Sequence, residues 1–323
     1  MKLVCWTEAV PARRHMVFLF GGGLIGAAIQ QALIRNAPDA QKELFPYDWN
    51  DPVVRSQQTD DLLAAATTWA RASGSRDIPL QCDVIWAAGR SGFASDSAQM
   101  QVETDLFSEV LDLARTLEAR FSDAEHGQHL FSSAGGLFEG QNFISAMSQP
   151  NPLRPYGEGK LAQEALLQAG GGHGGHTRCR IYRPSSVYGA SPGARLGLIG
   201  TLIVNGLAGR TTSIFGRPDT LRDYVFADDI GRFVQHQIWA PEPEPTKTFL
   251  LASGRPSPMF EIIARVEDIL QSPLLLRYDT SPTNALHMSF RPATQPSGWR
   301  QTAQETGIRL TEQRLRAAVL LNP

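Results

Sequence analysis

The chain of 323 residues is long enough to bury a large core, as one large domain or as two closely packed ones. Hydrophobic residues make up 42% and charged residues 19%, as in an ordinary globular protein, and a formal net charge of -2 offers no basic excess for binding nucleic acid. The cysteines Cys5, Cys82 and Cys179 are too few for a disulfide framework, so we expect a reducing, cytoplasmic location.

The N-terminal part of the chain has the pattern of neither a membrane anchor nor a signal peptide. The longest uncharged apolar run, residues 16–31, is too short and too rich in glycine to span a bilayer. Arg13 and Arg14 follow a weak apolar patch instead of preceding one, which is not signal-peptide order. We therefore expect no membrane contact. Residues 1–15 contain no recognisable element and leave Met16 as an alternative start.

A glycine-rich segment follows the first clear strand, Met16–Phe20. Gly21, Gly23 and Gly26 have the spacing G-x-G-x-x-G, and residues 27–34 have a helical pattern. A strand, this spacing and then a helix are the context that the dinucleotide-binding fingerprint requires. Glycines let the backbone approach a pyrophosphate, whose charge lies at the helix N-terminus. The alternative is a tight turn without a ligand. The segment predicts a dinucleotide site formed by Gly21, Gly23, Leu24, Ile25 and Gly26.

Two further segments support a dinucleotide site. An acidic residue is expected at the end of the next strand, where it would bind the ribose hydroxyls of the adenosine. Asp48 is the candidate, and no arginine follows at once to bind a 2′-phosphate, which favours NAD over NADP. The alternative is a turn carboxylate, because residues 48–52 are a strong turn signal. The buried strand that starts at Cys82 ends in small residues, as a strand beneath a cofactor would, namely Ala87, Ala88 and Gly89.

Tyr156 and Lys160 give the strongest indication of chemistry. They stand four positions apart on an amphipathic helical pattern and therefore share one face of the helix. A phenol with a reference pKa of about 10 is a poor base at neutral pH, but a nearby ammonium favours the phenolate and makes it a usable general base. A serine from a neighbouring strand end, Ser133 or less favourably Ser132, could hydrogen-bond the same substrate oxygen. Tyr-x-x-x-Lys alone is a weak pattern, and its weight comes from its surroundings.

Strands and helices alternate as far as Gly189, which predicts an α/β protein with a Rossmann-type, doubly wound parallel sheet. Beyond it the loops lengthen and proline becomes more frequent. We therefore expect a dinucleotide-binding domain over residues 1–190, to which residues 219–252 return, and a smaller, mixed substrate-binding lobe over residues 191–323. His173 and His176 lie in a glycine-rich loop without further ligands, so we predict no metal site.

One more segment has a specific pattern: Arg222-Asp223-Tyr224-Val225-Phe226-Ala227-Asp228-Asp229. It is similar to the Arg-Asp-Tyr-Val-x-Val-x-Asp signature of the NAD-dependent epimerase/dehydratase family, the extended short-chain dehydrogenases/reductases that act on nucleotide sugars. Five other segments resemble that family in the same order, so that the resemblance covers nearly everything from Met16 onward. They are residues 21–26, 83–89, 131–133, 156–167 and 183–189.

The resemblance implies NAD as the cofactor and a nucleotide sugar as the substrate. It makes Tyr156 the catalytic base and Ser133 its hydroxyl partner. Lys160 would promote the ionisation of the tyrosine and hold the nicotinamide ribose.

The resemblance also implies substrate-binding residues. Arg222 would bind the diphosphate, with an ion pair to Asp223 or Asp228 as the structural alternative. Arg291 loosely resembles a second phosphate-binding arginine, and a surface arginine is an equal alternative. Ser186 stands where an asparagine often contacts the substrate.

Several positions depart from the family pattern. Phe20 takes the place of the first glycine of the usual Gly-x-x-Gly-x-x-Gly when Gly23 and Gly26 are aligned. Glu103 or Thr104 falls where the family usually has an asparagine. The family's 4,6-dehydratases have Asp-Glu directly after the active-site hydroxyl, whereas Ala134-Gly135 follow Ser133 here, so dehydration lacks its acid and base.

Plain hydride transfer at a secondary alcohol remains. We expect 4-epimerisation, in which a keto intermediate turns over and is reduced from its other face. One alternative is a reductase or dehydrogenase that acts on a keto sugar or on another carbonyl compound, which includes non-sugar substrates. The other alternative is a dinucleotide-binding protein without catalytic activity. We also expect a homodimer, because residues 98–121 and 156–169 have more apolar positions than one sheet-facing stripe needs.

Overall fold

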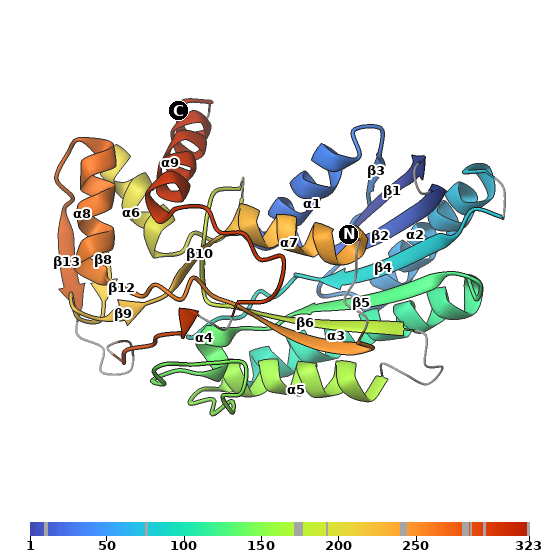
Figure 1. The fold of residues 1–323 in the computed structure, drawn as a ribbon, viewed down its shortest axis with the longest axis horizontal. Coiled ribbons are helices and arrows are strands. Elements are labelled where there is room, and N and C mark those ends of the chain that lie inside the picture. The colour runs from blue at the N-terminus through green and yellow to red at the C-terminus, as the bar shows by residue number, and fades with distance from the viewer. Residues whose placement is uncertain are drawn as a thin grey trace.

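The computed structural model describes residues 1–323 except 10–11, 75–76, 171–176, 192, 240–243, 280–283, 285, 293–294 and 322–323. The chain folds around a sheet of seven strands in the order β11-β6-β5-β4-β2-β1-β3 (Figure 1). The strands are β1 (Lys2–Ala9), β2 (Ala12–Phe20), β3 (Gln41–Leu44), β4 (Leu80–Trp86), β5 (Glu125–Phe131), β6 (Thr177–Pro184) and β11 (Thr246–Leu251). All of them except β1 run in one direction, as the predicted α/β, doubly wound fold requires.

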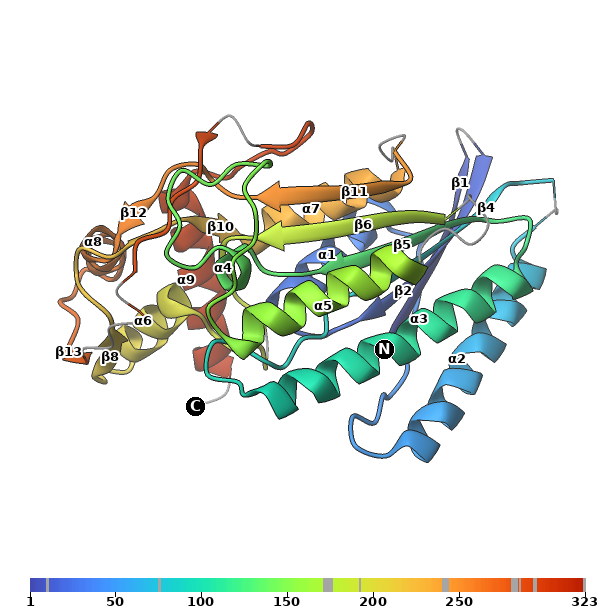
Figure 2. The ribbon, with the colours of Figure 1, turned by 90° about the horizontal axis from the view of Figure 1, so that it is seen from below.

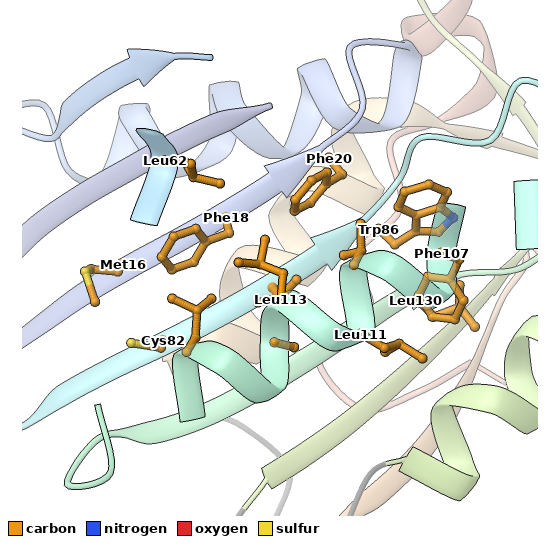
Figure 3. Close-up of a cluster of buried hydrophobic side chains, with 14 of the residues drawn as sticks. Met16, Phe18, Phe20, Leu62, Cys82, Trp86, Phe107, Leu111, Leu113 and Leu130 are labelled. Atoms are coloured by element: carbon orange, nitrogen blue, oxygen red, sulfur yellow. The ribbon is translucent and has the colours of Figure 1, made fainter. Parts of the chain in front are cut away.

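Helices cover both faces of this sheet. On one face lie α1 (Leu24–Asn36) and α7 (Ala227–Trp239), and on the other α2 (Pro52–Ala72), α3 (Ser97–Arg120) and α5 (Pro155–Gly170) (Figures 1 and 2). Because strand side chains alternate between faces, β2 contributes to both cores. Met16, Phe18 and Phe20 pack under the α2–α3 face together with Leu62 and Leu113 (Figure 3), whereas Val17 and Leu19 pack on the opposite face.

A smaller group of elements lies beyond the carboxyl ends of the parallel strands (Figure 1). It has its own apolar cluster, which includes Ile199, Ile214, Ile262 and Ile308. Strand β10 of this region pairs in parallel with β7, which directly follows β6. The remaining elements are α4 (Ala134–Leu137), β7 (Ser186–Tyr188), α6 (Leu198–Leu207), β8 (Thr212–Phe215), β9 (Leu221–Arg222), β10 (Tyr224–Phe226), β12 (Ser257–Pro258), α8 (Met259–Leu270), β13 (Leu276–Asp279) and α9 (Gln304–Leu321).

Strand β1 corrects the sequence interpretation of the N-terminus. It pairs antiparallel with β2, from Lys2 opposite Leu19 onward, and antiparallel with β3 on its other side. The expectation that residues 1–15 form no element is therefore wrong, and so is Met16 as the first residue of the fold. The apolar run of β1, residues 3–6, is short, and periodicity alone does not identify so short a strand.

The state of the cysteines and the length of the helices relate to the expected reducing compartment and the expected absence of membrane contact. Cys5, Cys82 and Cys179 are free and buried. Within the described ranges every helix is too short or too polar to cross a lipid bilayer.

We predict that a chain starting at Met16 does not fold. It would lose Leu3, Val4, Cys5 and Trp6, which are at most 5% exposed, and would leave β3 without its partner strand. Burying a side chain of this size contributes about 1.5–3 kcal/mol, so the loss approaches the whole stability of a domain. Circular dichroism and urea unfolding measure the effect. Cooperative unfolding at the midpoint of the full chain would contradict the prediction.

Candidate active site

The glycine-rich segment forms a tight connection between β2 and α1. Gly21 has φ +126°, and a Cβ atom at this residue would lie 2.2 Å from the carbonyl oxygen of Ala87. A Cβ atom at Gly26 would lie 2.3 Å from the carbonyl oxygen of Gly21. Larger residues are therefore excluded at both positions, because backbone atoms cannot give way.

The same segment leaves room for an anion. Around Gly22 and Gly23 a Cβ atom would meet nothing within 4 Å. Gly23 is the N-cap of α1 and provides no side-chain hydrogen bond, so that the first backbone N–H groups of the helix, at Leu24 and Ile25, have no partner within the helix. A helix N-terminus of this kind suits a phosphate group. The residues predicted to hold the pyrophosphate thus fit a dinucleotide.

The end of β4 lies beside the glycine-rich segment. The backbone N–H of Ala87 donates to the carbonyl oxygen of Phe20 at 2.8 Å, so Ala87, Ala88 and Gly89 continue next to Gly21. Ala88 also lines a cavity of about 380 Å³ with Trp49, Arg90, Val102 and Glu103 among its other walls. The walls of this cavity include Trp49, whose indole is an aromatic surface of the kind on which a planar base stacks. Trp49 was not predicted, because a tryptophan within a turn signal has no distinctive spacing.

Asp48 does not end a strand, contrary to the sequence interpretation. Strand β3 ends at Leu44, and β1 separates it from β2. One carboxylate oxygen of Asp48 accepts the backbone N–H groups of Asn50 and Asp51, both at 2.8 Å. These two bonds lower the pKa of Asp48, so that it is ionised at neutral pH. The alternative interpretation of Asp48, a carboxylate that caps a turn, is therefore present in the structure. If Asp48 also binds a ribose, it would do so through its second carboxylate oxygen.

The backbone at Gly136 contacts both Ser133 and the ring of Tyr156. Ser133 is the N-cap of α4, and its hydroxyl oxygen accepts the backbone N–H of Gly136 at 3.1 Å. A Cβ atom at Gly136 would lie 2.9 Å from the ring of Tyr156, and one at Gly135 would lie 3.7 Å from the Ser133 hydroxyl. The two glycines thus let the tyrosine ring approach the serine turn. The neighbouring Ser132 is buried, and its hydroxyl has no hydrogen-bond partner among the described residues.

Phe93 borders this group and was not predicted. Its ring lies 5.6 Å from the ring of Tyr156, centroid to centroid, and its ring edge would be 3.4 Å from a Cβ atom at Gly135. Arg154, two residues before the tyrosine, lies over the other part of this ring, with its guanidinium carbon 5.2 Å from the centroid. The same guanidinium forms a two-pronged ion pair with Glu139. An apolar ring at 44% exposure therefore lies next to Tyr156 and the turn that begins at Ser133.

Lys160 is buried one turn after Tyr156 and faces the same way. Its ammonium nitrogen lies 5.8 Å from the centroid of the tyrosine ring. It donates to Glu103 at 2.7 Å and to Gln163 at 3.1 Å. Burial alone would raise the pKa of Glu103, but Lys160, together with hydrogen bonds from Ser91 and Gln163, lowers it to about 2. Glu103, one of the two candidates for the position of the family's asparagine, is thus a carboxylate ion-paired with the lysine.

Arg222 lies at the junction with the smaller region, and its partners among the described residues are backbone carbonyl oxygens. It donates to Leu221, to Leu286 and, at 2.9 Å, to Asn284. Burial lowers its pKa. The alternative partners have other contacts: Asp223 accepts from Ser185, Ser253 and Gly254, and Asp228 pairs with Arg314.

The other predicted substrate residues lie on neighbouring segments. The backbone N–H of Ser186 in β7 donates to the carbonyl oxygen of Asp223, which directly follows Arg222. Arg291 is exposed, and its backbone N–H bonds to Ile144. The residue pair His173 and His176 lies outside the described residues. Among those that are described, no group of three or more histidine, cysteine, aspartate or glutamate side chains could hold a metal ion.

A larger cavity of about 800 Å³ lies elsewhere. It is lined by side chains that include Tyr188, Asp229, Arg255, Glu261 and Arg265. None of its lining residues belongs to the glycine-rich segment or to the Ser133–Tyr156–Lys160 group. Size alone therefore does not identify the candidate active site, which is defined by the convergence of its residues.

The fold and this convergence define a Rossmann-type dinucleotide-binding protein with a serine, a tyrosine and a lysine at the carboxyl edge of its sheet. The model of the NAD dependent epimerase/dehydratase family matches residues 17–250, and the chain belongs to this family of NAD-dependent enzymes. A UDP-glucose 4-epimerase of Mycolicibacterium smegmatis is 39% identical over 82 residues, which are 25% of this chain and 26% of that protein. The chain thus matches about a quarter of that relative's length.

Solved structures of low sequence identity share the fold. A UDP-glucose 4-epimerase of Thermotoga maritima, with UDP-glucose, has a TM-score of 0.69 at 16% identity, over 94% of this chain and 99% of that one. RMD from Pseudomonas aeruginosa, complexed with NADPH, has a TM-score of 0.67 at 20% identity, over 93% and 99%. A UDP-glucuronic acid 4-epimerase from Bacillus cereus, with UDP-glucuronic acid and NAD, has a TM-score of 0.66 at 18% identity, over 94% and 100%.

Proposed function

We propose that the protein is an NAD-dependent enzyme that interconverts the epimers of a nucleotide sugar at a secondary alcohol, C4 of the sugar. The observation that carries this proposal is that Ser133 and the ring of Tyr156 both lie against Gly136, beside the buried Lys160. The glycine-rich segment and the end of β4 lie at the same edge of the sheet. A substrate alcohol and a dinucleotide would therefore be held side by side.

Each residue of the group has a role in moving one proton. Tyr156, as the phenolate, would take the proton of the sugar hydroxyl, and Ser133 would donate a hydrogen bond to the same oxygen. Lys160 would stabilise the phenolate and bind the ribose next to the nicotinamide. When bound beside these residues, NAD would supply the hydride acceptor and, once reduced, the hydride donor. Tyr156 then gives the proton back to the keto oxygen after the sugar has turned over.

The residues after Ser133 support epimerisation over dehydration. Ala134, Gly135 and Gly136 carry no acid, and Glu139, the first carboxylate after the serine, is held in its ion pair with Arg154. Removal of water next to a keto group needs a free acid and base, which this segment does not offer. A carbonyl reductase would use the same three residues and stop after one hydride transfer, and it remains the second candidate function.

Arg222 would bind the diphosphate of the substrate. The half-buried guanidinium of Arg222 donates its hydrogen bonds to neutral carbonyl oxygens, and a phosphate would supply a counter-charge in direct contact. Ser186 and Arg291 are the further substrate contacts of this proposal.

We also propose the division into a dinucleotide-binding domain and a smaller substrate-binding lobe that the sequence predicts. Helix α7 and strand β11 belong to the dinucleotide-binding domain, because α7 packs beside α1 and β11 pairs with β6.

We predict that Tyr156→Phe lowers turnover about a hundredfold or more, the usual range for a positioned acid or base. UDP-glucose is the probe, and its conversion to UDP-galactose is followed by chromatography. Lys160→Met should have a similar effect and should also weaken NAD binding, because the ammonium serves both the phenol and the ribose. Thermal unfolding provides the control, since the loss of one phenol oxygen should leave it nearly unchanged. A Tyr156→Phe variant that keeps most of the parent's activity would refute the assignment.

We predict that the protein retains NAD and prefers it to NADP. An epimerase must not release its cofactor between the two half-reactions, so NAD should appear when purified protein is denatured and the supernatant is analysed. Asp48, ionised and close to Trp49, would repel a 2′-phosphate. Calorimetry on the emptied protein measures both affinities. Binding of NADP that equals or exceeds that of NAD would show that Asp48 is only a turn residue.

We predict a homodimer formed through α3 and α5, which lie side by side on one face of the molecule (Figure 2). The exposed residues of α5 are mostly apolar, namely Leu161, Ala162, Ala165, Leu166 and Ala169, with Glu158 and Gln168 as the polar ones. Sedimentation at micromolar concentration should give a dimer for the parent chain. Replacing Leu161 and Leu166 by glutamate should give a monomer, because the charges would be buried in the interface. A monomeric parent chain would contradict the prediction.

A further inference from the structure

Glu103 of α3 has an arrangement that the proposed chemistry does not account for. One of its oxygens lies 2.7 Å from the ammonium of Lys160, and the side chains of both residues are 5% exposed. Water therefore screens this ion pair only weakly. The positive charge of Lys160 that acts on Tyr156 is therefore accompanied by the equal and opposite charge of Glu103.

The second oxygen of Glu103 holds the loop after β4. It accepts the backbone N–H groups of Arg90 at 3.0 Å and Ser91 at 2.9 Å. Gly89 lies against the pair, and a Cβ atom there would be 3.1 Å from both the carboxylate and the ammonium. One carboxylate thus joins the loop that borders the cofactor cavity to the lysine that serves the catalytic tyrosine.

We propose that Glu103 is a positioning residue that offsets the charge of Lys160 and thereby sets the pH at which Tyr156 ionises, while it fixes the lysine and the loop at residues 89–91 in one geometry. The inference rests on the proposed function only in taking Tyr156 as the base. An epimerase or reductase of this design works best at a higher pH than one in which the lysine is unpaired.

Two arginines in this region are each held in an ion pair with a glutamate other than Glu103. Arg154 is bound to Glu139, and Arg183 of β6 is bound to Glu164 of α5. The charged residues within one or two helical turns of Tyr156 and Lys160 on α3 and α5, and on the segments that contact them, include Arg90, Glu103, Glu139, Arg154, Glu158, Glu164 and Arg183. Glu103 is the carboxylate among them that contacts Lys160.

The ionisation of Tyr156 can be measured without substrate or cofactor, by tyrosinate absorbance during an alkaline titration. The chain has 6 tyrosines. Burial raises the pKa of Tyr47 and Tyr224 to about 12 and that of Tyr182 and Tyr188 as well, so these four ionise above the range of an ordinary phenol. A Tyr278→Phe background removes the fifth, which is exposed. Tyr156→Phe in the same background serves as the blank, and the difference between the two titrations belongs to Tyr156.

In this background Glu103→Gln should lower the titration midpoint by roughly one pH unit, because the ammonium then acts on the phenol without a counter-charge. Glu118→Gln is the matched control, the same substitution on the same helix, roughly 22 Å farther along its axis. It should move the midpoint by no more than a few tenths of a unit. A midpoint that is unchanged or raised in Glu103→Gln would refute the inference.

A second comparison applies if the Glu103→Gln variant does not fold. Lys160→Met alone leaves a buried carboxylate near Tyr156 and should raise the midpoint, whereas the double variant with Glu103→Gln removes both charges and should return it towards the parent value. A double variant whose midpoint is raised as far as that of Lys160→Met would show that Glu103 has no influence. Because neither titration uses turnover, an absence of epimerase activity would count against the proposed function and not against this inference.

Discussion

The parallel pairing of β2 with β4 is the constraint on which the site depends. It brings the backbone of Gly21 so close to the carbonyl group of Ala87 that no side chain fits between them. The turn into α1 is therefore forced to be tight, and the open N-terminus of that helix faces the loop that continues from β4. Further along the sheet the same edge carries Ser133 at the end of β5. The chemistry is thus assembled by strand ends that the sheet holds in register, which explains how residues far apart in sequence meet.

The parts of this arrangement that could be predicted from sequence are those with a local cause. The glycine spacing, the strand before it and the helix after it belong to one short segment, and so do Tyr156 and Lys160. Their structural context follows from helix geometry and from the alternation of strands and helices. The predicted fold class is confirmed, and the family membership rests on the match over residues 17–250. The roles of the individual site residues stay predictions.

Three features differ from the sequence interpretation, and two of them, β1 and Glu103, could not be predicted because they depend on contacts between distant segments. Strand β1 is an interior strand only because β3 pairs with its other edge, and its own apolar run is too short to show this. Asp48 was placed at a strand end, whereas its carboxylate caps a turn that a sequence of turn-forming residues equally predicts. Glu103 appeared as a departure from a family pattern, and its ion pair with Lys160 arises only when α3 and α5 pack together. At such a departure the sequence pattern does not indicate the role of the residue, whereas the structure shows the partner that it contacts.

A crystal structure of the protein with NAD and UDP bound tests the central claim most directly. The account predicts the pyrophosphate at Gly22 and Gly23, the base in the cavity beside Trp49, and the nicotinamide ribose within hydrogen-bonding distance of Lys160. The nicotinamide ring should then face the space beside the Tyr156 hydroxyl. A dinucleotide bound elsewhere, or a nicotinamide ring directed away from Tyr156, would contradict the assignment of this site.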